Sequence, residues 1–343
     1  MLSYNILFVG DLNERAHSCS RADSLETLGH KVVKINTVPY IYHWSNPKAL
    51  RMPLIFRIFN KMGLPLDIGD INSKILDIVS SKFDLIVLES ATMVKPSTIK
   101  KIRLNFSEIK IYYMTNDNPN LNHCISRYVS SFLSLIDGII MIRGYNKVKI
   151  KERGAHNVIE INRAFDPNVH KRLEFDNSEP SNDVLFIGSF EKERAKIIHF
   201  LAENGVLITI YGSGWEALPI HKNINNAKRP TFANEYPKEV TQSKITLSFF
   251  RKISEDVNTS RIFEIPAMGG FLLSEYSDFV AQYFKEGEEV EFFRNEKECL
   301  KKIQYYLKNS EQSLDIKNRG YEKCMTNHSH EARMKYVINQ IFN

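Results

Sequence analysis

The sequence predicts an α/β protein made of two doubly wound parallel-sheet domains. Short runs of β-branched and aromatic residues recur along the 343 residues, with helical stretches between them. This alternation is typical of parallel βαβ units, whereas a sandwich or a helical bundle would repeat one type of element. The length suits two domains of about 150 residues each. Because such sheets bind ligands at the carboxyl ends of their strands, we expect the functional site in the cleft between the two domains.

The expected strands are short apolar runs, and several end at Gly, Glu-Ser or Thr-Asn, as buried parallel strands do where they emerge at the carboxyl edge. The first domain is expected to hold strands at residues 5–9, 31–36, 84–88, 110–114, 138–142 and 158–161. The second domain is expected to hold strands at residues 183–187, 206–211, 244–249 and 270–274.

A turn-rich segment at residues 176–182 separates the two sets of strands and predicts a linker. The C-terminal tail carries an i, i+3/i+4 apolar stripe, which predicts a closing helix. The predicted boundaries are 1–170 for an N-terminal domain, 171–182 for the linker, 183–328 for a C-terminal domain and 329–343 for the closing helix.

The amino-acid composition excludes several classes of protein. Hydrophobic residues make up 43% and charged residues 25%, as in ordinary globular domains, so a disordered or fibrous chain is not expected. A helix needs about 20 consecutive apolar residues to span a bilayer, and no uncharged apolar run in the sequence approaches that length. The first ten residues lack a charged n-region and a cleavage site, so we expect a cytoplasmic protein. The four cysteines have no C-x-x-C spacing, which argues against a disulfide framework or a zinc site.

The net charge of +6 is concentrated near the N-terminus, because residues 27–66 contain six basic residues and no Asp or Glu. Within this stretch, residues 48–61 interleave cations with large apolar groups, as amphipathic surface segments do. The apolar groups include Leu54, Ile55, Ile58 and Phe59. In one interpretation they pack a solvated helix on the core. In the other, the segment contacts anionic lipid or an anionic acceptor, which would place the protein peripherally on the inner face of the membrane.

The densest group of polar residues lies at 254–275. A polar loop and a Thr/Ser cap precede a helix there, and a Gly-Gly turn leads into an apolar strand. Arg261 and Glu264 lie one turn apart on one side of that helix. The free N–H groups at the start of a helix, together with the guanidinium of Arg261, can bind a phosphate. The carboxylate of Glu264 can accept hydrogen bonds from the two hydroxyls of a ribose. Asp256, before the cap, can reach another hydroxyl-rich group. A solvated Arg–Glu pair followed by a Gly cap is the simpler alternative.

Residues 261–275, Arg-Ile-Phe-Glu-Ile-Pro-Ala-Met-Gly-Gly-Phe-Leu-Leu-Ser-Glu, resemble the R-x-F-E-x-x-A-x-G-x-x-L-L-x-E signature of the CgeB-like glycosyltransferases, which are related to the group 1 glycosyltransferases. The resemblance implies the GT-B fold, with two Rossmann-like domains, and transfer of a sugar from a nucleotide-diphosphate donor to an acceptor hydroxyl. Retaining enzymes of this fold carry a Glu-x7-Glu motif, whose second Glu holds the ribose and whose first Glu contacts the donor sugar. Here the matching pair is Asp256 and Glu264.

Shorter matches extend the resemblance over most of the chain. Residues 183–194 are similar to the first strand and glycine turn of the C-terminal domain, where the backbone faces the donor pyrophosphate. Residues 211–215 match the y-G-x-g-w turn that flanks the base. The donor-binding residues that the resemblance implies are Gly188, Ser189, Arg194, Tyr211, Gly212, Trp215, Asn258, Thr259, Ser260 and Glu264.

The N-terminal half is expected to hold the acceptor. On the acceptor side, Gly10, Asp11 and Arg21 resemble the opening loop and first helix of the fold, and His123 is a further candidate, with a structural role as its alternative. Asp117 follows a buried strand, at the place where members of the family carry a D-x-P motif. It is the candidate for the general base or for a group that positions the sugar. An Asx-turn cap before a proline is the alternative for Asp117. The catalytic candidates are thus Asp117, Asp256 and Arg261.

The sequence has no Asp-x-Asp motif of the kind that holds Mn²⁺ in single-domain nucleotide-sugar transferases. We therefore expect metal-independent chemistry with no cofactor, in which Arg261 and Arg194 stabilise the charge on the leaving phosphate. The expected partners are a nucleotide-sugar donor and a glycan or lipid-linked acceptor, as in polysaccharide or glycoconjugate biosynthesis, and no nucleic acid.

Two other functions stay open on the same fold. One is a non-catalytic coat or matrix-assembly protein, since the namesake of the family is linked to spore maturation. The other is a nucleotide-sugar epimerase, which would need a second acid/base pair, such as Asp117 with His123 or with Asp11. The sugar, nucleotide, acceptor, linkage, anomeric configuration and oligomeric state are not readable from the sequence.

Overall fold

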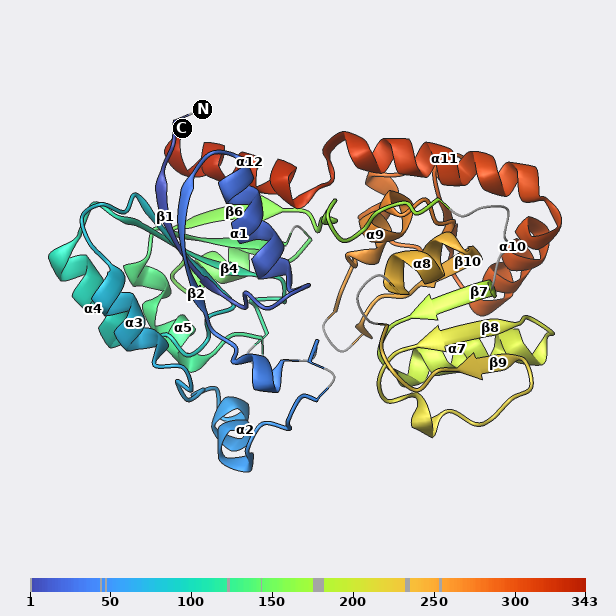
Figure 1. Ribbon diagram of the computed structural model, residues 1–343, viewed down its shortest axis with the longest axis horizontal. Helices are drawn as coiled ribbons and strands as arrows, with labels where there is room; N and C mark the ends of the chain where they lie inside the picture. Colours follow the sequence, from blue (N-terminus) through green and yellow to red (C-terminus); the bar gives the residue numbers. More distant parts are fainter. Residues whose placement is uncertain are drawn as a thin grey trace. The chain divides into compact units, whose positions relative to one another are not determined.

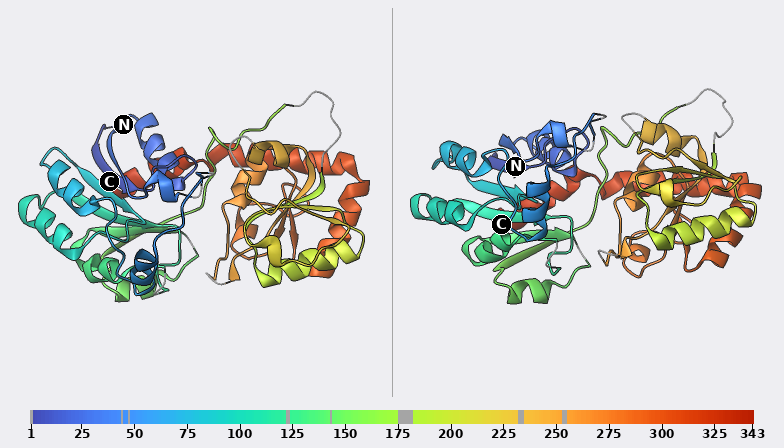
Figure 2. Two further views of the ribbon diagram at one scale, coloured as in Figure 1. Left: turned by 60° about the horizontal axis from the view of Figure 1, so that its bottom comes forward. Right: turned by 90° about the horizontal axis from the view of Figure 1, so that it is seen from below.

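The computed structural model describes residues 2–43, 45–46, 48–121, 124–142, 144–174, 182–231, 235–252 and 255–343. The chain forms two compact units (Figure 1). Unit 1 comprises Met1–Asn162 together with His330–Asn343, and unit 2 comprises Arg163–Ser329. Each unit holds one parallel sheet with helices on both faces, as Figures 1 and 2 show, so the predicted fold class of two doubly wound domains is confirmed.

Unit 1 is built on a six-stranded parallel sheet with the order β2-β1-β3-β4-β5-β6. Its strands are β1 (Asn5–Gly10), β2 (Lys31–Asn36), β3 (Leu85–Glu89), β4 (Lys110–Thr115), β5 (Gly138–Ile142) and β6 (Asn157–Ile161). The central strands are buried on both faces, which is why they appear in the sequence as continuous apolar runs. The winding direction reverses between β1 and β3, so the loops after these strands occupy the usual ligand-binding position of a doubly wound sheet.

The helices of unit 1 are α1 (His17–Thr27), α2 (Leu54–Lys61), α3 (Ile71–Ile78), α4 (Pro96–Asn105), α5 (Arg127–Phe132), α6 (Lys147–Glu152) and α12 (His330–Phe342), with short 3-10 turns η1 (Tyr40–Tyr42) and η2 (Leu133–Leu135). Helix α12 brings the end of the chain back to α1 (Figure 1). Its apolar stripe joins the core of unit 1, and Phe342 stacks on Tyr4 with ring centroids 3.8 Å apart.

Unit 2 holds a second six-stranded parallel sheet, with the order β12-β11-β10-β7-β8-β9. Its strands are β7 (Asn182–Ile187), β8 (Ile208–Tyr211), β9 (Ile224–Asn226), β10 (Ser243–Ser248), β11 (Leu272–Glu275) and β12 (Glu291–Phe293). Strands β9 and β12 were not predicted. They contain three residues each and lie at the two edges of the sheet, so they are too short to show a period-2 pattern.

The helices of unit 2 are α7 (Lys192–Glu203), α8 (Glu235–Thr241), α9 (Arg261–Ala267), α10 (Glu296–Lys308) and α11 (Ser310–Asn327), with 3-10 turns η3 (Trp215–Ala217) and η5 (Val280–Gln282). Alternate residues of β7 pack into different apolar clusters. Val184 and Phe186 pack with residues of α7 and α10, whereas Leu185 and Ile187 pack with residues of α8 and α9. Helices therefore cover both faces of this sheet.

The chain enters unit 2 at Arg163, earlier than the boundary at residue 170 that the sequence suggested. Phe165 is 1% exposed in an apolar cluster of unit 2, and its backbone N–H donates to the carbonyl of His328 at 3.1 Å. Packing of the Phe165 side chain thus attaches residues 163–170 to unit 2. The sequence placed the boundary later because it was judged only from where turn-forming residues are frequent. Residues 175–181 of the predicted linker lie outside the described residues.

Candidate functional site

Two glycines bring the loops after β7 and β8 into contact. The N–H of Gly188 donates to the carbonyl of Tyr211 at 2.8 Å. A Cβ on Gly212 would lie 1.9 Å from the carbonyl oxygen of Gly188, so no residue with a side chain fits there without moving the backbone. The two predicted glycine turns therefore form one structure at the carboxyl edge of the sheet.

Trp215 belongs to the core of unit 2. Its side chain is 0% exposed, and its indole N–H donates to the carbonyl of Gly188 at 2.7 Å. Its ring packs against Phe186 and Phe190. Trp215 was expected among the donor-binding residues, but its buried indole leaves no face to a ligand, so the turn and not this ring remains the candidate. Trp215 instead fixes the backbone of the glycine turn.

Tyr211 lies half-buried at the end of β8. The guanidinium of Arg229 is 5.4 Å from the centre of its ring. Burial, together with the nearby carboxylates of Glu239 and Glu235, raises the pKa of Tyr211 to about 12. Tyr211 therefore stays neutral at physiological pH and keeps a hydroxyl proton that it can donate.

Arg194 and Arg261 converge on the turn after β7. Arg194, in the first turn of α7, donates from Nη1 to the carbonyl of Ser189 at 3.0 Å. Arg261, the first residue of α9, donates from Nε to the carbonyl of Ile187 at 2.6 Å. The two guanidinium groups thus hold the backbone on either side of Gly188.

The charge of this pair is only partly compensated. Burial lowers the pKa of Arg194, the carboxylates of Glu191 and Glu275 oppose that shift, and the positive charges of Arg261 and Arg251 add to it. Glu191 Oε1 is 3.4 Å from Nη2 of Arg194. Within the described part of the chain, Nε of Arg194 is buried without a hydrogen-bond partner. Cations that repel each other beside an unused donor provide a favourable place for an anion.

Glu264 is held from two sides. Its side chain lies in the first turn of α9, and the residue is 7% exposed. The hydroxyl of Tyr236 on α8 donates to Oε2 at 2.9 Å, and Nε2 of His170 is 3.8 Å from Oε1. The N–H of Asp166 donates to Nδ1 of His170 at 2.9 Å, so the proton of a neutral ring is on Nε2, facing the carboxylate. The carboxylate of Glu264 is therefore oriented before any ligand binds.

Asp256 and Asn258 share a cationic partner, Arg163. Nε of Arg163 donates to Oδ1 of Asn258 at 2.8 Å, and its Nη2 is 3.9 Å from Oδ1 of Asp256. Asn258 is 1% exposed, and its Nδ2 has no hydrogen-bond partner in the described residues. Thr259 follows and is half-buried. Ser260 precedes α9 in a helical conformation and makes no side-chain cap, so the predicted capping role of this residue is wrong.

In unit 1, the predicted acceptor-side residue Arg21 is 2% exposed and pairs with the buried carboxylate of Glu89. Its Nη2 also donates to Oδ1 of Asn116 at 2.7 Å. Glu89 ends β3, and Asn116 directly follows β4. Arg21 therefore joins the carboxyl ends of neighbouring strands, and its neutralised and buried charge does not face a ligand as the sequence suggested.

The remaining acceptor-side candidates differ in environment. Gly10 is buried at the end of β1, and Asp11 follows it in a partly exposed loop. Asp117 is exposed, and its carboxylate makes no hydrogen bond or ion pair with any described residue. The Asx turn in this loop is made by Asn118, whose Oδ1 accepts from the N–H of Asn120 at 3.1 Å. His123 lies outside the described residues.

Comparisons with known proteins agree with this architecture. Residues 193–339 match a family model described as glycosyl transferase-like. A solved α-glucosyltransferase in complex with UDP-glucose and DNA containing an abasic site has a TM-score of 0.72 at 15% identity, with 100% of both chains covered. TarM has a TM-score of 0.66 at 10% identity, covering 100% of this chain and 99% of TarM.

A third solved structure, Anabaena HepE in complex with UDP and glucose, has a TM-score of 0.62 at 11% identity, covering 98% of this chain and 99% of HepE. A search of curated proteins gave no match. The likeness to these solved structures extends over nearly the whole chain and includes both six-stranded parallel sheets. This chain has the GT-B fold. At these identities the likeness establishes the fold alone.

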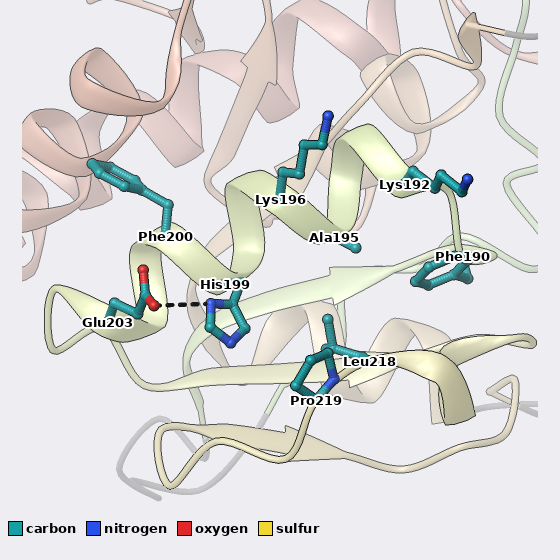
Figure 3. A pocket seen from close by; sticks show the side chains of 9 residues that line it. All are labelled: Phe190, Lys192, Ala195, Lys196, His199, Phe200, Glu203, Leu218 and Pro219. Atoms are coloured by element: carbon teal, nitrogen blue, oxygen red, sulfur yellow. Dashed lines mark ion pairs between the residues drawn. The ribbon is translucent and has the colours of Figure 1, made fainter.

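A cavity of about 470 Å³ lies beside α7, and its lining includes Phe190, whose ring packs against Trp215. Figure 3 shows it between α7 and the segment after η3, with His199 Nδ1 paired to Glu203 Oε1 at 3.3 Å. Its lining is Phe190, Lys192, Ala195, Lys196, His199, Phe200, Glu203, Leu218 and Pro219. None of the predicted site residues lines this cavity.

None of the described helices combines the length and the hydrophobicity needed to cross a membrane. Within the same part of the chain, no group of three His, Cys, Asp or Glu side chains is arranged to hold a metal ion.

We predict that Arg21→Met lowers the free energy of unfolding by about 3–5 kcal/mol, because it leaves the buried carboxylate of Glu89 unpaired. The double variant Arg21→Met/Glu89→Gln should recover most of this loss. Burial raises the pKa of Glu89, so in the single variant the folded state should bind a proton more tightly than the unfolded state, and stability should fall as pH rises. Urea unfolding at pH 5 and pH 8 measures both effects; equal losses in the single and double variants would contradict the pairing.

Proposed function

We propose that this chain is a glycosyltransferase that moves a sugar from a nucleotide-diphosphate donor to an acceptor hydroxyl without a metal ion. The observation that carries the proposal is the convergence of Arg194 and Arg261 on the turn at Gly188, where two repelling guanidinium groups and an unused donor suit a pyrophosphate. The glycosyl transferase-like match over residues 193–339 includes both arginines and supports this function. Structural neighbours that hold UDP or UDP-glucose support a nucleotide-sugar donor.

In this proposal the other donor contacts surround the same turn. The backbone at Gly188 and Ser189 approaches the pyrophosphate, and Tyr211 and Gly212 border the base. Glu264 accepts the ribose hydroxyls, with its carboxylate oriented by Tyr236 and His170. Asp256, together with residues 258–260, faces the donor sugar, and Nη2 of Arg163 lies 3.9 Å from its Oδ1.

Catalysis then follows from charge development. As the bond between the anomeric carbon and the phosphate oxygen breaks, negative charge grows on the leaving diphosphate. Arg194 and Arg261 are already held by backbone carbonyls, so they stabilise this charge without reorganising. In unit 1, the exposed carboxylate of Asp117 is free to orient an acceptor hydroxyl.

We also propose a cytoplasmic enzyme of polysaccharide or glycoconjugate synthesis whose α2 contacts an anionic membrane carrying a lipid-linked acceptor. The expectation that α2 packs its apolar residues on the core is wrong, because none of its residues is buried. Leu54, Ile55 and Ile58 are 66%, 56% and 48% exposed. The segment also presents the exposed cations Lys48, Arg51, Arg57 and Lys61. An exposed apolar face with cations and no carboxylate complements anionic lipid headgroups.

A coat or matrix-assembly protein and a nucleotide-sugar epimerase are the competing functions. Incubation with uridine, guanosine and thymidine diphosphate sugars separates them by product. A transferase releases nucleoside diphosphate, and release rises with a suitable acceptor. An epimerase returns an isomeric nucleotide sugar without release, and an assembly protein turns over none of the donors.

We expect Glu264→Ala to lower kcat/KM for donor turnover by about 30- to 900-fold, because loss of a ribose contact in a buried site costs about 2–4 kcal/mol of transition-state stabilisation. Glu311→Ala, at an exposed position of α11, is the matched control and should behave as the wild type. Release of nucleoside diphosphate provides the assay. An unchanged kcat/KM in the Glu264 variant would remove this residue from the donor site.

Turnover should persist in EDTA, since arginines rather than a metal neutralise the diphosphate in this proposal. The measurement is the initial rate of diphosphate release before and after chelation, followed by addition of Mg²⁺ or Mn²⁺. A rate that falls on chelation and returns with either ion would reject metal-independent transfer while leaving the transferase activity in place.

Changing Lys48, Arg51, Arg57 and Lys61 to Gln should lower co-sedimentation with anionic vesicles at least tenfold, because each basic residue near such a surface contributes about 1 kcal/mol at low salt. A variant with Lys100, Lys101, Lys149 and Lys151 changed to Gln removes the same charge from other exposed positions and is the control. Equal sedimentation of both variants, or binding of duplex DNA in preference to vesicles, would contradict the membrane contact.

A further inference from the structure

A carboxylate lies among the arginines at the turn after β7, where the proposed function places the diphosphate. Oε1 of Glu191 is 3.4 Å from Nη2 of Arg194 and 4.0 Å from Nε of Arg251. Arg251 lies in the loop after β10, and its positive charge helps to lower the pKa of Arg194, so it acts on the same turn. Neither Glu191 nor Arg251 was a candidate in the sequence, and the proposed function has not used them.

Glu191 occupies the N-cap of α7, but its side chain does not cap the helix. Ser, Thr, Asp and Asn are the usual residues at an N-cap, because their short side chains accept from the free N–H groups of the first turn. Oε2 of Glu191 instead accepts from the backbone N–H of Lys252 at 3.4 Å. Since β7 and β10 are neighbouring strands, the side chain spans the loops that follow them. Its position therefore serves the charged groups at this edge of the sheet.

The two arginines beside Glu191 differ in how firmly they are held. The side chain of Arg194 is 8% exposed, and its Nη1 donates to the carbonyl of Ser189 at 3.0 Å. The side chain of Arg251 is 52% exposed, and its ion pair with Glu191 is the longer of the two. Exposed ion pairs contribute little to stability, so Arg251 can change partners at small cost. A diphosphate offers it more negative charge and more acceptor oxygens than one carboxylate does.

The nearby carboxylate of Glu275 is arranged differently. Its Oε2 accepts from the backbone N–H of Phe250 at 3.0 Å, and its Oε1 pairs with Nζ of Lys252. The charge of Glu275 is thus balanced by a lysine and not by an arginine of this group. Of these two carboxylates, Glu191 is the one whose cationic partners a diphosphate would also engage.

We propose that Glu191 is a charge-selecting residue of the donor site and that Arg251 is its exchangeable partner. Before a donor binds, the carboxylate of Glu191 engages both Arg194 and Arg251. The diphosphate then takes over Arg251, while the carboxylate stays beside Arg194 and repels the phosphates. This inference rests on the proposed function and adds to it how the site distinguishes the donor from the product.

The repulsion discriminates because the donor and the product differ in charge. The terminal phosphate of a nucleoside diphosphate loses its second proton at about pH 6, so above this pH the product carries one more negative charge than the nucleotide sugar. A fixed carboxylate therefore raises the free energy of the bound product more than that of the bound donor. Glu191 thereby favours release of the diphosphate after transfer.

The first experiment measures Kd at pH 8, by calorimetric titration, for the diphosphates of uridine, guanosine and thymidine and for their glucose conjugates. Glu191→Gln should bind a nucleoside diphosphate about tenfold more tightly than the wild type does, and its glucose conjugate only about threefold more tightly, because the conjugate carries less charge for the carboxylate to repel. Glu193→Gln removes the same charge from an exposed position in the first turn of α7. It is the control and should keep the wild-type affinities.

Arg251→Gln tests the exchange of partners by its coupling to Glu191. In the wild type the diphosphate must replace Glu191 as the partner of Arg251, so loss of this arginine should weaken binding of the nucleoside diphosphate by only about threefold. In the Glu191→Gln background the competing carboxylate is gone, and the same change should weaken binding by about tenfold or more. Equal losses in the two backgrounds would contradict the exchange.

The outcomes separate this inference from the proposed function. Failure of the wild type to bind any of these nucleotides would reject the proposed donor site, and this inference with it. Binding by the wild type that is not tightened in Glu191→Gln, or that is tightened equally in Glu193→Gln, would overturn only the inference. If Glu191→Gln fails to fold, Glu191→Ser decides by the same measurements, because it removes the charge and places a favoured N-cap residue at the start of α7.

Discussion

Repulsion between the guanidinium groups of Arg194 and Arg261 is the constraint on which the chemistry of unit 2 depends. Each group is held by a backbone carbonyl next to Gly188, so neither can move away from the other without losing a hydrogen bond. The carbonyl of Gly188 is in turn fixed by the indole of Trp215, and Gly212 must lack a side chain for the two loops to meet. Packing in the core thereby keeps two cations together, and an anionic ligand lowers the energy of an arrangement that folding has already imposed.

The acidic residues at this edge of the sheet are held by partners of their own. Glu264 and Asp256 each have a basic or hydroxyl-bearing partner, and two of these partners, His170 and Arg163, come from the segment by which the chain enters unit 2. Anchoring of that segment by Phe165 thus positions groups as well as closing the core. In unit 1 a pair of opposite charges is fully buried, because Arg21 and Glu89 are both buried and neutralise each other. A paired charge of this kind defines geometry but offers no field to a ligand.

The sequence predicted the central strands of both sheets because each is a continuous apolar run, and it located Arg261 and Glu264 because one helical turn joins them. It could not find Arg163, His170 or Tyr236, since their contacts with Asp256 and Glu264 connect residues far apart in the chain and no spacing marks them. Trp215 was misassigned for a related reason: an aromatic residue in a glycine-rich turn has the same sequence pattern whether its ring faces a ligand or the core.

The uncompensated charge has a different sign in each unit, and each sign favours a different kind of ligand. In unit 2 the excess at the turn after β7 is positive and partly desolvated, which favours a diphosphate over a neutral sugar. In unit 1 the carboxylate of Asp117, directly after β4, is exposed at the carboxyl edge. A diphosphate would be repelled by Asp117, whereas a hydroxyl group can donate to its carboxylate. The sign of the local charge therefore supports the proposed assignment of the donor to unit 2 and of the acceptor to unit 1.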